Sequence, residues 1–164
     1  MQSNQKIFEK AEQLLKSLGL EIVKEDKNRP WGGFLVIEES QAEKFALHFF
    51  PEEDFNKLKI SDKLSPKILL VAPGKRLSWQ YHFRRAEIWR CIDGKVAVAT
   101  SLTDEETEQH LLKIGDKIKL KQGERHRLIG LDDWGIVAEI WQHTDALNPS
   151  DEEDIVRLQD DFGR

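Results

Sequence analysis

The sequence predicts an all-β fold, either a sandwich or a barrel, preceded by an amphipathic helix. From Lys67 onwards, short apolar segments recur at intervals of roughly ten residues, and turn signals such as Asp93-Gly94 and Gly115-Asp116 separate them. Regularly spaced short strands with such breaks are typical of β-sandwiches and barrels. The length of 164 residues fits a single domain with a sizeable core.

The first element is a helix predicted over residues 3–18. Ser3 or Asn4 can cap its start and Gly19 can end it. Its apolar residues lie three and four positions apart, namely Ile7, Phe8, Ala11, Leu14, Leu15 and Leu18. This apolar stripe needs a partner, which is either the outside of the barrel or a second copy of the chain in a homodimer. The polar run 25–30 predicts a turn, and residues 34–37 predict a strand.

A second helix is predicted over residues 40–50, ending before Pro51, and a polar loop follows up to residue 66. The acidic run after Pro149 suits the positive start of a further short helix. The predicted strands between them lie at residues 68–74, 77–83, 86–94, 95–100, 108–116, 117–124, 126–130 and 134–141.

Composition limits the classes of partner. The formal net charge of -5 argues against binding to nucleic acid, whose phosphates would be repelled. The first residues lack the apolar core of a signal peptide, and no apolar run is long enough to span a membrane. The single cysteine, Cys91, sits in an apolar segment and fits a buried residue in a reducing compartment. We therefore expect a cytoplasmic protein that contacts neither nucleic acid nor a membrane.

Four side chains that can bind a metal ion stand in two glycine-bounded stretches. Gln80 and His82 lie two residues apart, so on a strand they point to one face, and Glu87 on the next strand can face them. The second stretch runs from Gly115 and supplies His126. An isolated inward histidine is usually a hydrogen-bonded core residue, but four such donors at this spacing favour a divalent ion such as zinc, manganese or cobalt.

These two stretches resemble the paired motifs of the cupin superfamily, which read G-x5-H-x-H-x(3,4)-E-x6-G and G-x5-P-x-G-x2-H-x3-N. Gln80 stands at the first histidine, and His82, Glu87 and His126 match the remaining ligands. This sequence departs from the second motif at Lys121, where proline is usual, and at Gly130, where asparagine is usual.

The resemblance narrows to the phosphomannose isomerase domain of type II mannose-6-phosphate isomerases. It rests on Arg29-Pro-Trp-Gly32, Pro73 to Trp89, Gly123 to Leu128 and the ending from Asp154, and it covers residues 29–164 apart from 39–66. It implies a double-stranded β-helix, the cupin jelly-roll barrel, over 29–164 behind a helical extension at 1–28. It also implies the ligand set Gln80, His82, Glu87 and His126. Arg84 stands where these relatives often have histidine.

Aldose–ketose isomerisation moves a proton between C1 and C2 through an enediolate, whose oxyanion a cation can stabilise. Glu139 is a candidate base, although it also fits an outward position on a strand. Arg127 is a second candidate catalytic residue, and Arg84, Arg85 and Arg127 are candidates for binding a substrate phosphate. Trp31 and Trp79 are candidate walls for the sugar ring.

The resemblance implies a metal-dependent isomerase of a sugar phosphate, first of mannose 6-phosphate to fructose 6-phosphate. It would use one divalent ion, zinc before manganese, cobalt or nickel. Two alternatives stay open, an isomerase of another sugar or phosphosugar, which the departure at Arg84 favours, and a sugar-binding cupin without catalysis.

Overall fold

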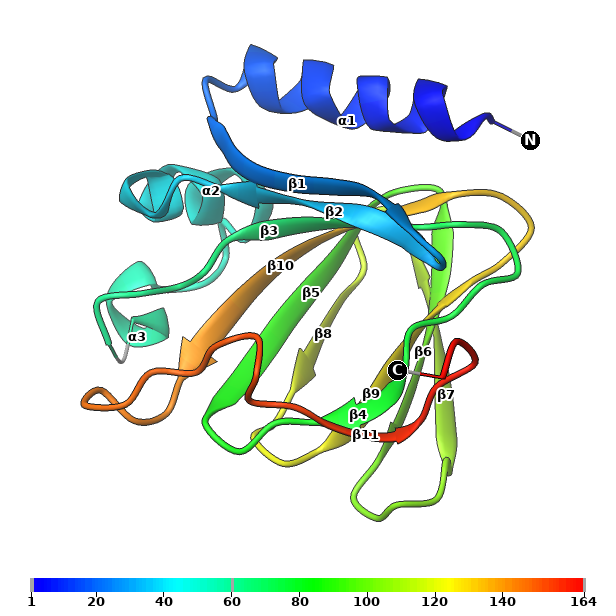
Figure 1. Cartoon of the computed structure of the whole chain (residues 1–164). Helices are drawn as coiled ribbons and strands as arrows, with labels where there is room; N and C mark the ends of the chain where they lie inside the picture. Colours follow the sequence, from blue (N-terminus) through cyan, green and yellow to red (C-terminus); the bar gives the residue numbers. More distant parts are fainter. Residues whose placement is uncertain (1, 60, 164) are drawn as a thin grey trace.

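The computed structural model describes residues 2–59 and 61–163 and contains two antiparallel sheets that face one another (Figure 1). Three residues of the predicted domain lie outside the described residues, namely Met1, Ile60 of the predicted loop and Arg164 of the predicted C-terminal motif. In order across the first sheet, the strands are β1 (Ile22–Arg29), β2 (Gly32–Ile37), β3 (Lys67–Val71), β10 (Gly135–His143), β5 (Arg85–Asp93) and β8 (Lys117–Leu120). In the second they are β11 (Val156–Gln159), β4 (Trp79–Tyr81), β9 (Arg125–Gly130), β6 (Lys95–Ser101) and β7 (Glu108–Lys113).

Strand β3 shows why the first sheet is apolar on both faces. Ile68 and Leu70 belong to the core outside this sheet, whereas Leu69 and Val71 belong to the core between the two sheets. Successive residues of a strand point to opposite faces, so the uninterrupted apolar run predicts burial on both sides. Cys91 lies in the inner core and is fully buried, as expected.

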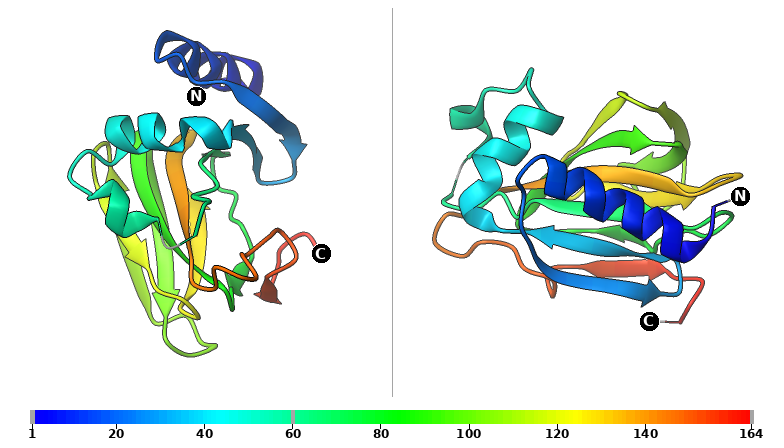
Figure 2. Two further views of the ribbon diagram at one scale, coloured as in Figure 1. Left: turned by 90° about the vertical axis from the view of Figure 1, so that its left-hand side faces the viewer. Right: turned by 90° about the horizontal axis from the view of Figure 1, so that it is seen from above.

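Helix α1 (Asn4–Ser17) covers the outer face of the first sheet (Figure 2). The Ser3 side chain accepts a hydrogen bond from the backbone N–H of Lys6 at 3.2 Å, which caps the helix as predicted. Phe8 is buried and meets Trp134 edge to face, with 6.0 Å between ring centroids. Of the two partners considered for the apolar stripe, the structure shows the outside of the barrel.

The remaining helices pack beside the same face of the first sheet. They are η1 (Glu39–Gln41), α2 (Ala42–Phe49) and α3 (Phe55–Leu58). Helix α2 buries Phe45 and Phe49 in the outer core, as its sequence predicts. Among the described residues, no helix is both long and apolar enough to cross a membrane.

Two local predictions are wrong. Residues 25–30 were expected to form a turn, but they extend β1 as far as Arg29, because this strand pairs with β2 at the edge of the sheet. The segment 1–28 is therefore helical only up to Ser17. The acidic run after Pro149 forms turns rather than a helix and leads into β11.

Candidate metal centre

The register between strands brings the predicted ligands to the inner faces of the two sheets. Gln80 of β4 lies directly opposite His126 of β9, and residues opposite one another in a pair of strands point to the same side. Glu87 of β5 lies opposite Trp141 of β10 in the facing sheet. His82 follows the end of β4. Segments distant in sequence therefore converge between the sheets.

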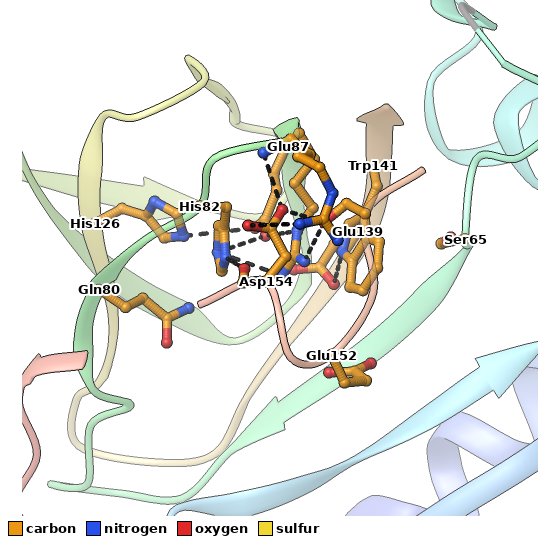
Figure 3. A network of polar contacts seen from close by, with 12 residues as sticks. Ser65, Gln80, His82, Glu87, His126, Glu139, Trp141, Glu152 and Asp154 are labelled. Carbon is orange, nitrogen blue, oxygen red and sulfur yellow. Dashed lines mark hydrogen bonds and ion pairs between the residues drawn. The ribbon is translucent and has the colours of Figure 1, made fainter. Parts of the chain in front are cut away.

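Three of these residues form a compact buried cluster (Figure 3). His82, Glu87 and His126 are each 2% exposed, and one potential ligand atom from each lies within 4.8 Å of the others. His82 Nε2 is 3.1 Å from Glu87 Oε1, and His126 Nε2 is 3.6 Å from Glu87 Oε2. Ligand atoms bound at about 2.1 Å to one ion lie about 3 to 4 Å apart, so these separations suit a shared cation.

The hydrogen bonds of both imidazoles leave the inward nitrogen as an acceptor. His82 Nδ1 lies 2.7 Å from the carbonyl oxygen of Asp154, and His126 Nδ1 lies 3.1 Å from that of Glu124. A carbonyl only accepts, so each Nδ1 carries the proton and each Nε2 is an acceptor. The Nε2 of His82 lies 3.3 Å from Arg85 Nη2, which can donate to it, whereas that of His126 has no such donor among the described residues. Backbone partners of this kind commonly orient histidines that bind metals.

The Nε2 atom of His126 gives the clearest test of whether the residues fit a metal ion. It is buried and has no hydrogen-bond partner among the described residues. A buried polar atom without a partner costs free energy, which a cation at this point would recover. His82, Glu87 and His126 can hold a metal ion, and the donor set fits a divalent one.

Gln80 lies beside the cluster and is half-buried. Ser78 Oγ donates a hydrogen bond to Gln80 Oε1 at 2.6 Å. An amide oxygen has two lone pairs, so it can accept this bond and still coordinate an ion. Gln80 lies opposite His126, and its role as a fourth ligand stays a prediction.

The pKa shifts of Glu87 and His126 favour the protonation states that bind a cation. Burial alone would raise the pKa of Glu87, but attraction from His82 and Arg85 outweighs it and holds the pKa well below its usual value. Burial lowers the pKa of His126 to about 4, and repulsion from His82 adds to the effect although Glu87 opposes it. Glu87 is therefore an anion and His126 a neutral imidazole at neutral pH.

Arg85 is committed to this cluster. Its Nε donates to Glu87 Oε1 at 3.0 Å, and its Nη1 donates to Ser150 Oγ at 2.8 Å. Its guanidinium also stacks on the Trp141 ring, 3.5 Å from the centroid. The side chain is 5% exposed, so it positions Glu87 and has little freedom to follow a substrate.

Glu139 lies on the inner face of β10, which excludes the outward position considered for it. Its two oxygens accept hydrogen bonds from Trp89 Nε1 at 2.7 Å and Trp141 Nε1 at 3.0 Å. Trp89 Nε1 also lies 3.1 Å from Glu87 Oε2, so one indole N–H links the two carboxyl groups. Burial, and then the negative charge of Glu87, raise the pKa of Glu139 to about 8.

A cavity lies beside the cluster, and only some of the other predicted site residues line it. It is lined by Arg29, Trp31, Phe34, Lys67, Leu69, Leu77, Gln80, Arg85, Glu87, Trp89, Glu139, Trp141, Glu152, Ile155 and Arg157. Trp31, Arg85 and Glu139 are thus brought to the cavity.

Arg84, Arg127 and Trp79 are not among these lining residues. Trp79 donates to the carbonyl oxygen of Asp104, and Arg127 donates to that of Leu77 and to Glu106. Arg84 lies near the carboxylates of Asp151 and Asp154, at 3.5 and 3.9 Å.

The sequence analysis missed Asp154, which joins the C-terminal segment to the cluster. Its carbonyl contacts His82, and its carboxylate accepts hydrogen bonds from the backbone N–H groups of Phe83 and Arg84, both at 2.9 Å. Ser150 Oγ donates to the same carboxylate at 2.6 Å. The resemblance of the segment from Asp154 was the only signal in the sequence that pointed to this position.

The sequence and the fold of this chain are similar to those of known proteins. A family model described as mannose-6-phosphate isomerase C-terminal matches residues 41–160. No curated protein sequence matches the chain. A crystal structure of CapF with the inhibitor 3-isopropenyl-tropolone superposes with a TM-score of 0.57 and 13% identity, over 85% of this chain and 34% of that chain. The capsular polysaccharide assembling protein CapF from Staphylococcus aureus gives 0.54 and 14%, over 85% and 32%. The chain thus spans about a third of the length of these CapF chains, and at such identity the likeness concerns the fold alone.

Proposed function

The chain belongs to the family described as mannose-6-phosphate isomerase C-terminal and has the cupin fold, and from this premise we propose that it is a metal-dependent aldose–ketose isomerase. The proposed substrate is a sugar phosphate, first mannose 6-phosphate, which would be converted to fructose 6-phosphate. The proposed ligands of one divalent ion are Gln80, His82, Glu87 and His126.

The observation that carries this proposal is the buried cluster with its unpartnered imidazole nitrogen. His126 Nε2 faces Glu87 in a dry environment and lacks a hydrogen-bond partner among the described residues. A structural histidine would normally bond through both nitrogens or reach water. A bound divalent ion would supply a Lewis acid for the oxygen on which negative charge develops during enolisation. Zinc suits this mixed nitrogen and oxygen set, and manganese, cobalt and nickel are the alternatives.

Glu139 is the residue proposed to move the proton between C1 and C2 of the sugar. A general base works best when its pKa lies near the working pH, and the pKa of Glu139, about 8, meets this condition. The indole N–H groups of Trp89 and Trp141 hold the carboxyl group in one orientation. Both indoles also exclude water from this part of the cavity wall.

We also propose that the chain acts as one domain over residues 1–164 in the cytoplasm, on a small-molecule substrate and without nucleic acid. The packing of Phe8 in one core with strand residues such as Leu35 supports the first point. The buried free thiol of Cys91 supports a reducing compartment.

The test is a panel of aldoses with the metal-loaded protein. Mannose 6-phosphate should yield fructose 6-phosphate, and in deuterated water the sugar should exchange its C2 proton. Turnover of another phosphosugar or of free sugars alone would keep the isomerase but change its substrate. Tight binding of every sugar tested without C2 exchange would refute catalysis and leave a sugar-binding cupin.

A further inference from the structure

The charged side chains of the cavity wall do not all have partners. Four cations and three carboxyl groups line it, namely Arg29, Lys67, Arg85 and Arg157, and Glu87, Glu139 and Glu152. Charges on such a wall are normally paired within the protein or reserved for a ligand. The pairing of each cation therefore shows which of them is available to a substrate.

Three of the cations are already engaged with carboxylates. Arg85 is bound to Glu87, and Lys67 Nζ lies 2.8 Å from Glu152 Oε1. Arg29 Nε lies 3.1 Å from Asp26 Oδ2, within its own strand.

Arg157 is the exception. Within residues 2–59 and 61–163, its guanidinium has neither a hydrogen-bond nor an ion-pair partner. It keeps an exposed head at the cavity.

The register of β11 aims Arg157 at the same space as the proposed metal ligands. Arg157 lies directly opposite Gln80 of β4, so the two side chains point to the same face of their sheet. Gln80 in turn lies opposite His126. Arg157, which has no partner among the described residues, therefore shares one wall of the cavity with Gln80, and Glu87 lines the same cavity from the facing sheet.

A second donor without a partner lines this cavity. Trp31 is 4% exposed, and its indole Nε1 is buried with no hydrogen-bond partner among the described residues. Trp31 lies in the turn between β1 and β2, and this turn lies near the C-terminal segment (Figures 1 and 2). Phe162 of that segment packs in the same inner core as Trp31. Two donors in one cavity that lack acceptors among the described residues indicate a ligand rich in acceptor oxygens.

We propose that Arg157 binds the phosphate group of the substrate, with the Trp31 indole N–H as a further donor to its oxygens. A guanidinium fork matches two oxygens of a phosphate monoester and carries a permanent charge. This assignment rests on the proposed isomerase function. It places the phosphate of the bound substrate next to β11, the strand that carries Arg157. It replaces Arg84, Arg85 and Arg127 in that role, because the first and third do not line the cavity and the second is bound to Glu87.

The experiment compares Arg157→Gln and Arg157→Lys with the wild type, all metal-loaded. Binding of mannose 6-phosphate and of free mannose is measured by calorimetry, and KM and kcat are measured for mannose 6-phosphate. Loss of one charge-assisted pair should weaken binding of mannose 6-phosphate by roughly 10- to 100-fold and raise its KM similarly, with little change in kcat. Arg157→Lys should recover part of the loss, since it keeps the charge but not the fork. Affinity for free mannose should not change.

Arg76→Gln is the matched control, because Arg76 pairs with Asp161 on the surface and does not line the cavity. It removes the same charge and should bind mannose 6-phosphate as the wild type does. Equal affinity of wild type and Arg157→Gln for mannose 6-phosphate would overturn the proposal, as would an equal loss in Arg76→Gln. If mannose 6-phosphate binds through Arg157 but no sugar is isomerised, the phosphate subsite stands and the proposed function fails.

Discussion

Replacement of Glu139 by glutamine tests the proposed proton transfer. The variant keeps the shape of the side chain but removes the group that accepts the proton. Both carboxyl oxygens of Glu139 accept an indole N–H, so the amide of Glu139→Gln can keep only one of these two bonds. Trp89 Nε1 also lies 3.1 Å from Glu87 Oε2, so the full cost arises only if Trp141 is the indole that loses its acceptor. This loss should destabilise the fold by about 1 to 3 kcal/mol, which a domain of this size tolerates.

The effect on turnover should be much larger than the effect on stability. A positioned general base contributes roughly 10²- to 10⁴-fold, so kcat should fall by that factor while KM changes little. The pKa of Glu139 is raised to about 8, so the base is ionised in a minority of molecules at pH 7 and wild-type kcat should increase with pH towards 8. The charge of Glu87 contributes to this raised pKa, so a cation bound beside Glu87 should move the inflection to lower pH.

The assay is exchange of the C2 proton of mannose 6-phosphate in deuterated water, followed by NMR at several pH values. Glu152→Gln is the matched control, because it removes a carboxylate that lines the cavity and, among the described residues, pairs with Lys67 alone. It should exchange at close to the wild-type rate. If Glu139→Gln, folded and metal-loaded, exchanges within threefold of wild type, Glu139 is not the base.

Three further predictions concern the ligands and the fold. Gln80→Ala should lower the metal affinity, measured by competition with a chelator, by at least roughly 10-fold. The melting temperature of the apoprotein should not change. Unchanged metal affinity would remove Gln80 from the ligand set. Phe8→Ala should cost about 3 to 5 kcal/mol in denaturant unfolding, because Phe8 packs on Trp134, but should leave metal content unchanged; a loss below 1 kcal/mol would contradict its place in the core. Burial alone would raise the pKa of Asp154, but hydrogen bonds from Ser150 and two backbone N–H groups outweigh it and lower the pKa below 3.8. The stabilisation it gives is complete above the unfolded value and is lost as pH falls through the folded one, so Asp154→Asn should be less stable at pH 7 and less sensitive to acid. An equal fall in melting temperature from pH 5 to 2 in both proteins would contradict this.

The strands could be predicted because their signals are local, and the cluster of His82, Glu87 and His126 could be predicted because these residues stand in two recognisable motifs. Alternating or continuous apolar runs between turn residues define strands, and two-residue periodicity relates Gln80 to His82, whereas the place of Glu87 on the next strand depended on the family motif. The same periodicity also separates Arg127 from His126 and Trp79 from Gln80, since neighbours on a strand face opposite sides. The sequence therefore held the information that these two residues point away from the cavity.

The remaining features depend on tertiary contacts that no local pattern records. The polar run ending at Arg29 becomes a strand because it pairs with β2. The acidic run before β11 forms turns in which Asp151 and Asp154 accept nearby N–H and O–H donors. The ion pair of Arg85 with Glu87 is visible only once the segments are assembled, and so is the finding that Arg157 has no partner within residues 2–59 and 61–163.

The central claim is that one divalent ion binds between the two sheets, and metal stoichiometry tests it most directly. Elemental analysis of the purified protein should find about one equivalent of one divalent metal per chain. Glu87→Ala and His126→Ala should each lose the metal while the barrel stays folded by circular dichroism. His110 is a half-exposed histidine outside the cluster, so His110→Ala should keep the metal. A wild type without bound metal after incubation with zinc, manganese, cobalt and nickel, or unchanged metal content in both ligand variants, would contradict the account.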